Sequence, residues 1–213
     1  MQECFPGVKK FNPVQSAVLD CALNSKKNML ICAPTSSGKT NIAVLTILNT
    51  LKHYRNGQGE YDLSKFKVVY IAPMKALVAE VTGNLSNRLK GITVKELTGD
   101  MQLSRQQINE TQIIVCTPEK WDIITRKAGD RLFTELVRLI IIDEIHLLGD
   151  SRGPVLESII ARTIRQVENT QEQVRLVGLS ATLPNYQDIA TVLRVNAQDG
   201  LFYFDSSYRP IPL

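Results

Sequence analysis

Several features that would narrow the function at once are missing from this chain of 213 residues. Its 4 cysteines, Cys4, Cys21, Cys32 and Cys116, lie far apart and form no Cys-x-x-Cys pair, which favours buried thiols in a reducing compartment over disulfides or a zinc site. No apolar run reaches about 18 residues, so no membrane-spanning helix is expected. No tract is poor enough in apolar residues to predict long disorder, and no internal repeat is present.

The excess of positive over negative charge is also small. The chain has 25 Lys and Arg against 21 Asp and Glu, which gives a net charge of +4 and a sequence pI of about 8.9. This mildly basic balance permits nucleic-acid binding but does not demonstrate it. The hydrophobic content of 44% is enough for a substantial core. Composition therefore indicates an ordinary folded domain, and the function has to be inferred from motifs.

Short apolar runs rich in valine and isoleucine alternate along the chain with helical patterns. Strands of this composition are typically buried on both faces, so the sequence predicts an α/β fold with a mainly parallel sheet, helices on both faces and ligands at the carboxyl ends of the strands. Asn12, before Pro13, is expected to cap the first helix. The predicted strands are Met29–Cys32, Val68–Ala72, Val94–Leu97, Ile113–Cys116, Leu139–Ile142, Val174–Leu179 and Leu201–Phe204. The predicted helices are Pro13–Leu23, Lys39–His53, Met74–Leu89, Pro118–Arg126, Pro154–Glu168 and Asn185–Leu193.

Between the first of these strands and the next helix, the chain reads Ala-Pro-Thr-Ser-Ser-Gly-Lys-Thr from Ala33 to Thr40. Backbone N–H groups of such a loop can bind phosphates, while Lys39 reaches the β and γ phosphates and the Thr40 hydroxyl holds Mg²⁺. Ala33 replaces the first glycine of the general pattern, and Ser36 stands where many related loops have another glycine. A turn that binds nothing is the alternative. The residues expected to bind a nucleotide here are Pro34, Thr35, Ser36, Ser37, Gly38, Lys39, Thr40 and Asn41.

Two adjacent acids, Asp143 and Glu144, follow the apolar run that ends at Ile142. Asp143 is expected to bind Mg²⁺ through water, and Glu144 to orient and deprotonate an attacking water. Alternatively, the two acids only stabilise the positive end of the following helix. Their occurrence downstream of Lys39 and Thr40 favours catalysis.

A Ser-Ala-Thr segment at Ser180–Thr182 follows the predicted strand Val174–Leu179. The short hydroxyls of this segment are expected to bond His146 and to relay the state of the nucleotide to another surface. A Ser/Thr turn that caps the next helix is an equally open alternative.

In their order, these motifs resemble the first domain of superfamily 2 helicases over nearly the whole chain. The matching segments are Ala33–Thr40, Ala72–Leu77, Thr98–Asp100, Thr117–Lys120, Asp143–His146 (a DEIH box) and Ser180–Thr182. Three further segments are similar to the superkiller-like branch of these helicases. Within that branch, the chain resembles the large double-cassette helicases of the spliceosomal U5 particle and of the activating signal cointegrator complex. The segments are Glu119–Asp122, Ile145–Leu148 and Arg152–Glu157. The segment Val94–Ser104 favours the second of these two groups.

The resemblance implies a RecA-like fold that uses ATP and Mg²⁺. It implies that Gln15, with Phe11 nearby, reads adenine, and that Ser180, Ala181 and Thr182 couple the ATP site to the nucleic-acid site. The implied catalytic residues are Lys39, Asp143, Glu144 and His146, with Thr40 and Asp143 as metal ligands. Single-stranded RNA or DNA would be held through its backbone by Pro73, Lys75, Thr98, Gly99, Thr117, Pro118 and Glu119, although Thr117 and Pro118 also suit a plain helix cap.

The implied activity is ATP-dependent unwinding with 3′-to-5′ movement. We expect residues 1–207 to form the first RecA-like domain and residues 208–213 to begin a connector to a second, which this chain lacks and which would make the isolated domain nearly inactive. The resemblance places the parent protein in a large complex, in the nucleus rather than the cytoplasm, acting in mRNA splicing or DNA repair without a membrane partner. A P-loop translocase that does not separate strands remains an alternative, as does a nucleotide-gated scaffold, which Ser36 keeps open.

Overall fold

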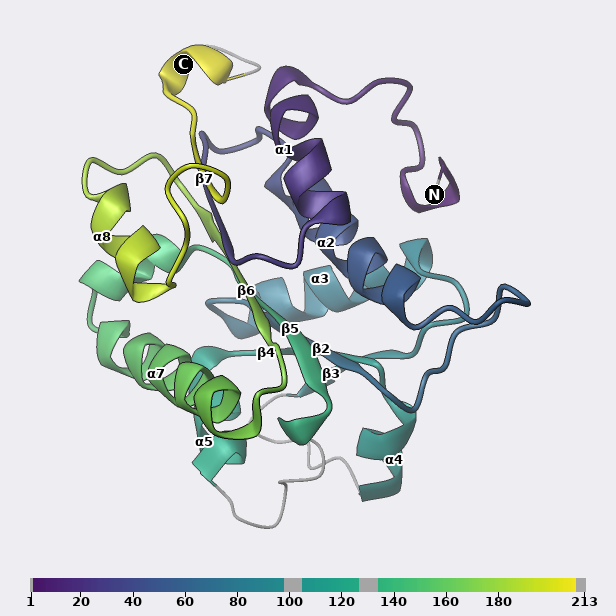
Figure 1. Cartoon of the computed structure of the whole chain (residues 1–213). Coiled ribbons are helices and arrows are strands. Elements are labelled where there is room, and N and C mark those ends of the chain that lie inside the picture. The colour runs from purple at the N-terminus through teal and green to yellow at the C-terminus, as the bar shows by residue number, and fades with distance from the viewer. Residues whose placement is uncertain (1, 98–104, 127–133, 210–213) are drawn as a thin grey trace.

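A seven-stranded sheet forms the centre of the computed structural model, which describes residues 2–97, 105–126 and 134–209 (Figure 1). All neighbouring strands in the order β3-β4-β2-β5-β6-β1-β7 are parallel. The predicted α/β fold with a parallel sheet is therefore confirmed. The strands are β1 (Met29–Cys32), β2 (Lys67–Ile71), β3 (Val94–Leu97), β4 (Ile113–Cys116), β5 (Val137–Ile142), β6 (Arg175–Ser180) and β7 (Leu201–Tyr203).

The helices that were predicted begin and end within two residues of their expected positions. They are α1 (Pro13–Asn24), α2 (Lys39–His53), α3 (Lys75–Arg88), α5 (Pro118–Arg126), α7 (Gly153–Thr170) and α8 (Tyr186–Val192). The sequence did not predict the short elements, whose few residues carry too little periodicity to detect. These are α4 (Arg105–Glu110) and the 3₁₀ turns η1 (Gln2–Cys4), η3 (Ile145–Gly149) and η4 (Ser206–Tyr208).

Helices cover both faces of the sheet, and the two faces have separate cores. Alternate strand residues such as Ile31 and Leu139 pack with residues of α1, α2 and α3, whereas their neighbours Cys32 and Ile140 pack with residues of α5, α7 and α8. Figure 1 shows α5 and α7 on the opposite side of the sheet from α1 and α2. Burial on both faces explains why the strands lack polar alternation. Trp121 of α5 is 1% exposed and serves as a packing anchor.

The predicted cap of α1 is present as a reciprocal pair of hydrogen bonds. The backbone N–H of Gln15 donates to the side-chain oxygen of Asn12 (2.8 Å). In return, the backbone N–H of Asn12 donates to the side-chain oxygen of Gln15 (3.1 Å). Pro13 occupies the first turn, where its missing N–H costs nothing. This capping box fixes the start of α1 and, with it, two side chains that reach the neighbouring loop.

The motifs meet at one edge of the sheet because each follows the carboxyl end of a strand. The loops after β1, β2, β4, β5 and β6 carry them. The segment Thr98–Asp100 lies outside the described residues. The cysteines are all free thiols, and three of the 4 are buried, as predicted. In the described ranges, the helices are too short or too polar for any of them to cross a bilayer.

Candidate nucleotide-binding site

The loop between β1 and α2 is shaped as an anion-binding turn. Ser36 and Gly38 both have left-handed backbone conformations, with φ of 66° and 84°. Gly38 is the N-cap of α2 and supplies no side-chain hydrogen bond, so the first N–H groups of the helix are left for another acceptor. A loop of this kind at a helix N-terminus favours phosphate groups.

Two side chains at the start of α1 hold this loop from outside. The amide of Asn12 donates to the carbonyl oxygen of Ser37 (2.8 Å), and that of Gln15 donates to the carbonyl oxygen of Gly38 (3.3 Å). The positive φ of Gly38 favours glycine, and a Cβ atom there would lie 2.1 Å from the Gln15 side-chain nitrogen, so a larger residue would displace the Gln15 amide from the loop. Gln15 is only 4% exposed and both ends of its amide contact protein, so its expected contact with adenine stays a prediction.

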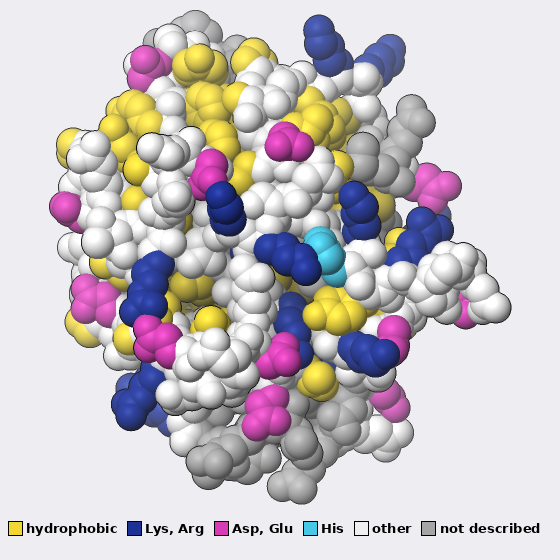
Figure 2. Space-filling view, viewed as in Figure 1, with side chains coloured by type: hydrophobic (Ala, Val, Ile, Leu, Met, Phe, Trp, Pro, Cys, Tyr) yellow, Lys and Arg dark blue, Asp and Glu magenta, His cyan; other side chains and the backbone are white. Residues whose placement is uncertain are grey.

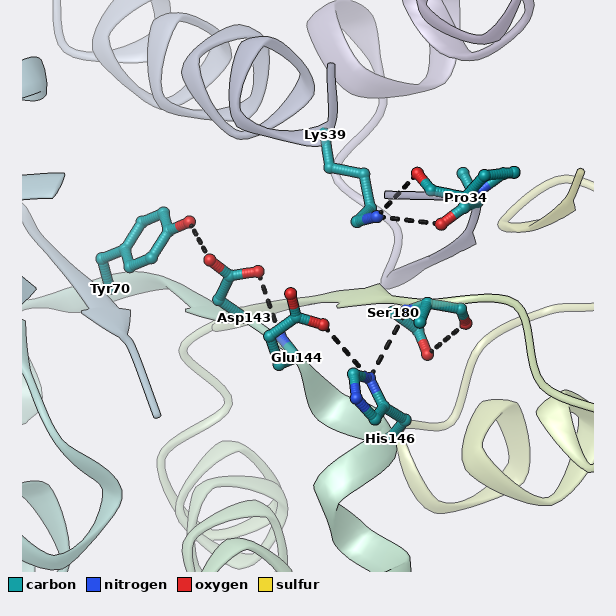
Figure 3. Close-up of polar contacts among 9 residues, drawn as sticks. Pro34, Lys39, Tyr70, Asp143, Glu144, His146 and Ser180 are labelled. Atoms are coloured by element: carbon teal, nitrogen blue, oxygen red, sulfur yellow. Dashed lines mark hydrogen bonds and ion pairs between the residues drawn. The ribbon is translucent and has the colours of Figure 1, made fainter. Parts of the chain in front are cut away.

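The Lys39 ammonium faces the acid pair across the end of the sheet (Figure 3). It donates to the carbonyl oxygens of Ala33 (2.8 Å) and Pro34 (3.1 Å). Burial lowers the pKa of Lys39, and the negative charges of Glu144 and Asp143 oppose that shift. The loop and the acid pair, far apart in sequence, are therefore close enough to interact electrostatically.

Asp143 is held in place on several sides. Its backbone N–H donates to the carbonyl oxygen of Ile71 (2.9 Å) at the end of β2. The Tyr70 hydroxyl donates to Oδ2 of Asp143 (2.8 Å), and the Glu144 backbone N–H donates to Oδ1 (3.0 Å). Burial raises the pKa of Asp143, while the hydrogen bond from Tyr70 lowers it. Tyr70 was not among the predicted site residues; the only signal was a hydroxyl-bearing ring in an otherwise aliphatic stretch of strand.

His146 lies between Glu144 and the segment after β6, but the contact is not the expected one. The backbone N–H of Ala181 points at Nδ1 of His146 (3.4 Å), while the Ser180 hydroxyl donates to the carbonyl oxygen of Ala181 (2.8 Å). The prediction that hydroxyls bond His146 is wrong for Ser180, because its fully buried hydroxyl donates to the carbonyl oxygen of the next residue, Ala181, instead. Glu144 Oε2 lies 3.2 Å from the same Nδ1, and one nitrogen cannot donate to Glu144 and accept from Ala181 in the same state. The two contacts are therefore alternatives that depend on the proton at Nδ1.

The residues at this edge suit a magnesium-bound triphosphate. The Ser37 hydroxyl is buried and has no partner among the described residues, so an acceptor or donor is missing inside the loop. Each oxygen of Asp143 accepts one donor and keeps capacity for another, and the Thr40 side chain is exposed at the start of α2. In the described ranges there is no cluster of three or more His, Cys, Asp or Glu that could hold a metal by itself. Mg²⁺ commonly takes one or two carboxylates and completes its shell with phosphates and water.

At the other end of the loop, the N-terminal segment packs beside the first turn of α2. Phe11 is half-buried and contacts Phe5 edge-to-face with ring centroids 5.3 Å apart. The Arg88 guanidinium lies 5.1 Å from the Phe5 ring and donates to the side-chain oxygen of Asn41 (2.7 Å). The expected base contact of Phe11 and phosphate contact of Asn41 stay predictions, with Asn41 turned toward Arg88.

The loops expected to grip nucleic acid are neighbours because β2 and β4 pair. Lys75 and Glu119 are exposed and Thr117 is half-buried, whereas Pro73 and Pro118 are buried. The expected contacts of the two buried prolines with nucleic acid therefore stay predictions. Thr98 and Gly99 lie outside the described residues.

Arg152, before α7, joins these two loops, and no predicted role had been given to it. Its guanidinium donates to the carbonyl oxygen of Pro73 and lies 3.5 Å from a carboxylate oxygen of Glu119. The pairing also accounts for an acid among residues expected to face phosphates, because Arg152 offsets the charge of Glu119.

The charge on one face of the molecule gives no independent indication of a nucleic-acid track. On the face drawn in Figure 2, Lys and Arg side chains are interspersed with Asp and Glu rather than gathered in one patch. A cavity of about 180 Å³ is lined by the basic residues Lys26, Arg138 and Arg175, but it lies at the start of β5 and β6, opposite the phosphate loop. The case for nucleic-acid binding therefore depends on the loops after β2 and β4.

The left-handed backbone of Ser36 predicts a stability effect. Replacing Ser36 by glycine should raise the free energy of unfolding by roughly 0.5–1 kcal/mol, because a residue with a Cβ atom is strained at positive φ and glycine is not. Denaturant unfolding would measure it. Ser36→Ala keeps the Cβ atom and should bring no such gain; equal stabilisation by both changes would contradict the strain.

Comparisons with known proteins agree with this arrangement. A family model described as DEAD/DEAH box helicase matches residues 12–189. The chain is 66% identical, over 97% of its length, to the activating signal cointegrator 1 complex subunit 3-like protein of Dictyostelium discoideum. Over 100% of its length it is 64% identical to the DExH-box ATP-dependent RNA helicase DExH12 of Arabidopsis thaliana and 58% identical to the U5 small nuclear ribonucleoprotein 200 kDa helicase of Homo sapiens.

The chain spans only about one tenth of the length of these curated relatives, 9% to 10%. Both groups of helicase named in the sequence analysis are among them, and the identities do not separate the two. The preference given by Val94–Ser104 therefore stays a prediction. The family model covers most of the chain and includes the phosphate loop and the acid pair, so this chain belongs to the DEAD/DEAH box helicase family.

Proposed function

We propose that this chain is the first ATP-binding domain of an ATP-dependent helicase that acts on RNA. The observation that supports this most is the meeting of the phosphate loop and the acid pair at one edge of the sheet, with the Lys39 ammonium facing both acids. The names of relatives such as DExH12 and the U5 200 kDa helicase support RNA as the substrate, although backbone contacts from these loops would suit DNA as well.

The chain's own residues would divide the work at the ATP site. Lys39 would exchange its carbonyl contacts for the phosphates, and the N–H groups at the start of α2 would bind phosphate oxygens. Thr40 and Asp143 would hold Mg²⁺, which neutralises charge on the phosphates when bound. Glu144 would take a proton from the attacking water.

His146 is placed to pass the state of this site onward. Its Nδ1 atom lies within reach of Glu144 on one side and of the Ala181 backbone N–H on the other. Nδ1 donates to Glu144 in one tautomer of the imidazole and accepts from Ala181 in the other, so only one of the two contacts can form at a time. We infer that the segment Ser180–Thr182 responds through the backbone N–H of Ala181 rather than through the Ser180 hydroxyl.

Residues 1–207 would form one half of the ATP site, and residues 208–213 would lead toward a second RecA-like domain that supplies the other half. Closure of the two domains around ATP would complete the catalytic arrangement, and reopening after hydrolysis would shift the grip on the strand. Without its partner domain, the chain should bind ATP weakly, hydrolyse it very slowly and unwind nothing. Movement in the 3′-to-5′ direction and a nuclear location in a large splicing or DNA-repair complex are further parts of the proposal.

A protein that carries both domains tests the proposal by its ATPase rate with and without single-stranded RNA or DNA, together with a strand-separation assay. We expect stimulation by RNA and unwinding of a duplex with a 3′ overhang. Stimulation without unwinding would point instead to a translocase. ATP that is bound but scarcely cleaved would point to a nucleotide-gated scaffold.

Lys75 provides a prediction for the nucleic-acid loops. Lys75→Ala should weaken binding of the two-domain protein to single-stranded RNA about equally for all sequences, because a contact to phosphate reads no base. A plot of the logarithm of the binding constant against the logarithm of the salt concentration has a negative slope, and this slope should become less steep by about 0.7 when one phosphate contact is lost. Lys52→Ala, at the far end of α2, is the control and should leave the slope unchanged. An unchanged slope for Lys75→Ala would remove Lys75 from the track.

A further inference from the structure

Tyr70 is a buried polar side chain whose role the proposed mechanism has not used. It lies in β2, directly beside β5, and is 1% exposed. Its hydroxyl donates to Oδ2 of Asp143 (2.8 Å), as Figure 3 shows. Burying a hydroxyl without a partner would be costly, so the position of the ring and that of the carboxylate depend on each other.

Strand β2 therefore holds Asp143 at two points. The carbonyl oxygen of Ile71 accepts the Asp143 backbone N–H (2.9 Å), and the Tyr70 hydroxyl binds the side chain. The second carboxylate oxygen accepts the Glu144 backbone N–H (3.0 Å). With one donor on each oxygen, the carboxylate is fixed in rotation while both oxygens keep room for another contact.

The Tyr70 hydroxyl is a hydrogen-bond donor at neutral pH, as tyrosine ordinarily is, and its proton points at Oδ2 of Asp143. A phenylalanine would fill nearly the same space in the core formed with α1, α2 and α3, so packing alone does not explain the hydroxyl.

We propose that Tyr70 is a positioning residue for Mg²⁺, which it serves by fixing the Asp143 carboxylate in the orientation that accepts the hydrated metal. The inference rests on the proposed function of Asp143 as a metal ligand. Hydrogen-bond partners of metal-binding carboxylates act in this way in other metal sites, where losing one commonly costs 10- to 100-fold in metal affinity.

The test is Tyr70→Phe in the protein that carries both domains, with binding of a fluorescent ADP analogue measured against Mg²⁺ concentration and again in EDTA. We expect the Mg²⁺ concentration for half-maximal effect to rise about 10- to 100-fold, with affinity in EDTA unchanged. An unchanged Mg²⁺ dependence would overturn the proposal. An equal loss of affinity in EDTA would also overturn it, because a packing defect acts without the metal.

Two further variants make the result specific. Tyr54→Phe removes a hydroxyl from a ring that stacks on Phe66 at the other end of α2, and it should leave the Mg²⁺ dependence unchanged. In an Asp143→Asn background, Tyr70→Phe should add nothing to the Mg²⁺ dependence, since its effect passes through Asp143. Each titration is run well below the melting temperature of its variant.

The Asp143→Asn variant also separates two kinds of failure. If it abolishes the Mg²⁺ dependence while Tyr70→Phe does not change it, only the role of Tyr70 is refuted. If Asp143→Asn itself leaves the Mg²⁺ dependence intact, the proposed metal site is refuted as well.

Discussion

In the two-domain protein, Glu144→Gln should lower the ATP turnover rate by about 100-fold or more while ATP binding is retained. The side chain stands at the end of β5 beside the residue expected to hold the metal, with φ of 50° at its own backbone. Glutamine has the same shape and can still accept a hydrogen bond at the position from which Glu144 contacts His146. It cannot take a proton from water, so the chemical step is lost and the nucleotide contacts remain.

The measurement is single-turnover hydrolysis together with an ATP dissociation constant for the same variant. Glu157→Gln, on the exposed surface of α7, removes an acid away from the site and should hydrolyse ATP at the normal rate. Normal turnover by Glu144→Gln would show that Glu144 is not the base. A loss of ATP binding equal to the loss of turnover would assign the residue to binding instead.

Lys39→Ala should weaken nucleotide binding by about 10- to 150-fold, which corresponds to roughly 1.5–3 kcal/mol for lost charge-assisted hydrogen bonds. In the structure, the ammonium bonds only two loop carbonyl oxygens and faces two carboxylates without an ion pair to either among the described contacts. Its charge is therefore available to phosphates. Burial already lowers the pKa of Lys39, so bringing a phosphate beside it should favour the charged form.

Equilibrium binding of a fluorescent ATP analogue would measure this effect, with the free energy of unfolding as the control for folding. Because Ala33 and Pro34 are buried, losing these two hydrogen bonds should also lower the free energy of unfolding, so affinities are compared under conditions in which both proteins are folded. Lys39→Arg keeps the positive charge but replaces the compact ammonium group by a larger planar guanidinium. Its affinity for the nucleotide should therefore lie between those of the wild type and Lys39→Ala. Wild-type affinity in Lys39→Ala would show that the phosphates lie elsewhere.

The parallel sheet and its helices could be predicted from the sequence because buried strands and amphipathic helices carry repeating patterns. Lys39–His53 and Pro118–Arg126 were predicted to the residue. The start of α2 is marked by a glycine and the start of α1 by a capping asparagine, and both signals are local. The meeting of the motifs at one edge of the sheet could be predicted because all parallel strands have their carboxyl ends at the same edge.

What the sequence could not predict depends on contacts between distant residues. Nothing near Tyr70 indicates that its hydroxyl reaches Asp143, and nothing near Arg152 indicates that it joins Pro73 to Glu119. The expected link from Ser180 to His146 was placed on a hydroxyl, but the structure has the backbone N–H of Ala181 there. Such pairings depend on register between strands and on side-chain rotamers, which no local pattern encodes.

Ser36 shows a limit of a different kind. Its place in the loop was known to differ from the common glycine, but only the structure revealed that it adopts a left-handed backbone. The loop therefore keeps the shape that glycine allows at a cost in strain. The roles of these residues toward ATP, magnesium and nucleic acid stay predictions.

A crystal structure of the two-domain protein with Mg²⁺ and a non-hydrolysable ATP analogue would test the central claim most directly. We predict β and γ phosphates in the loop between β1 and α2, with a single Mg²⁺ bound by the Thr40 hydroxyl and linked through water to Asp143. A triphosphate bound away from Lys39, or a metal out of reach of either Thr40 or Asp143, would contradict it.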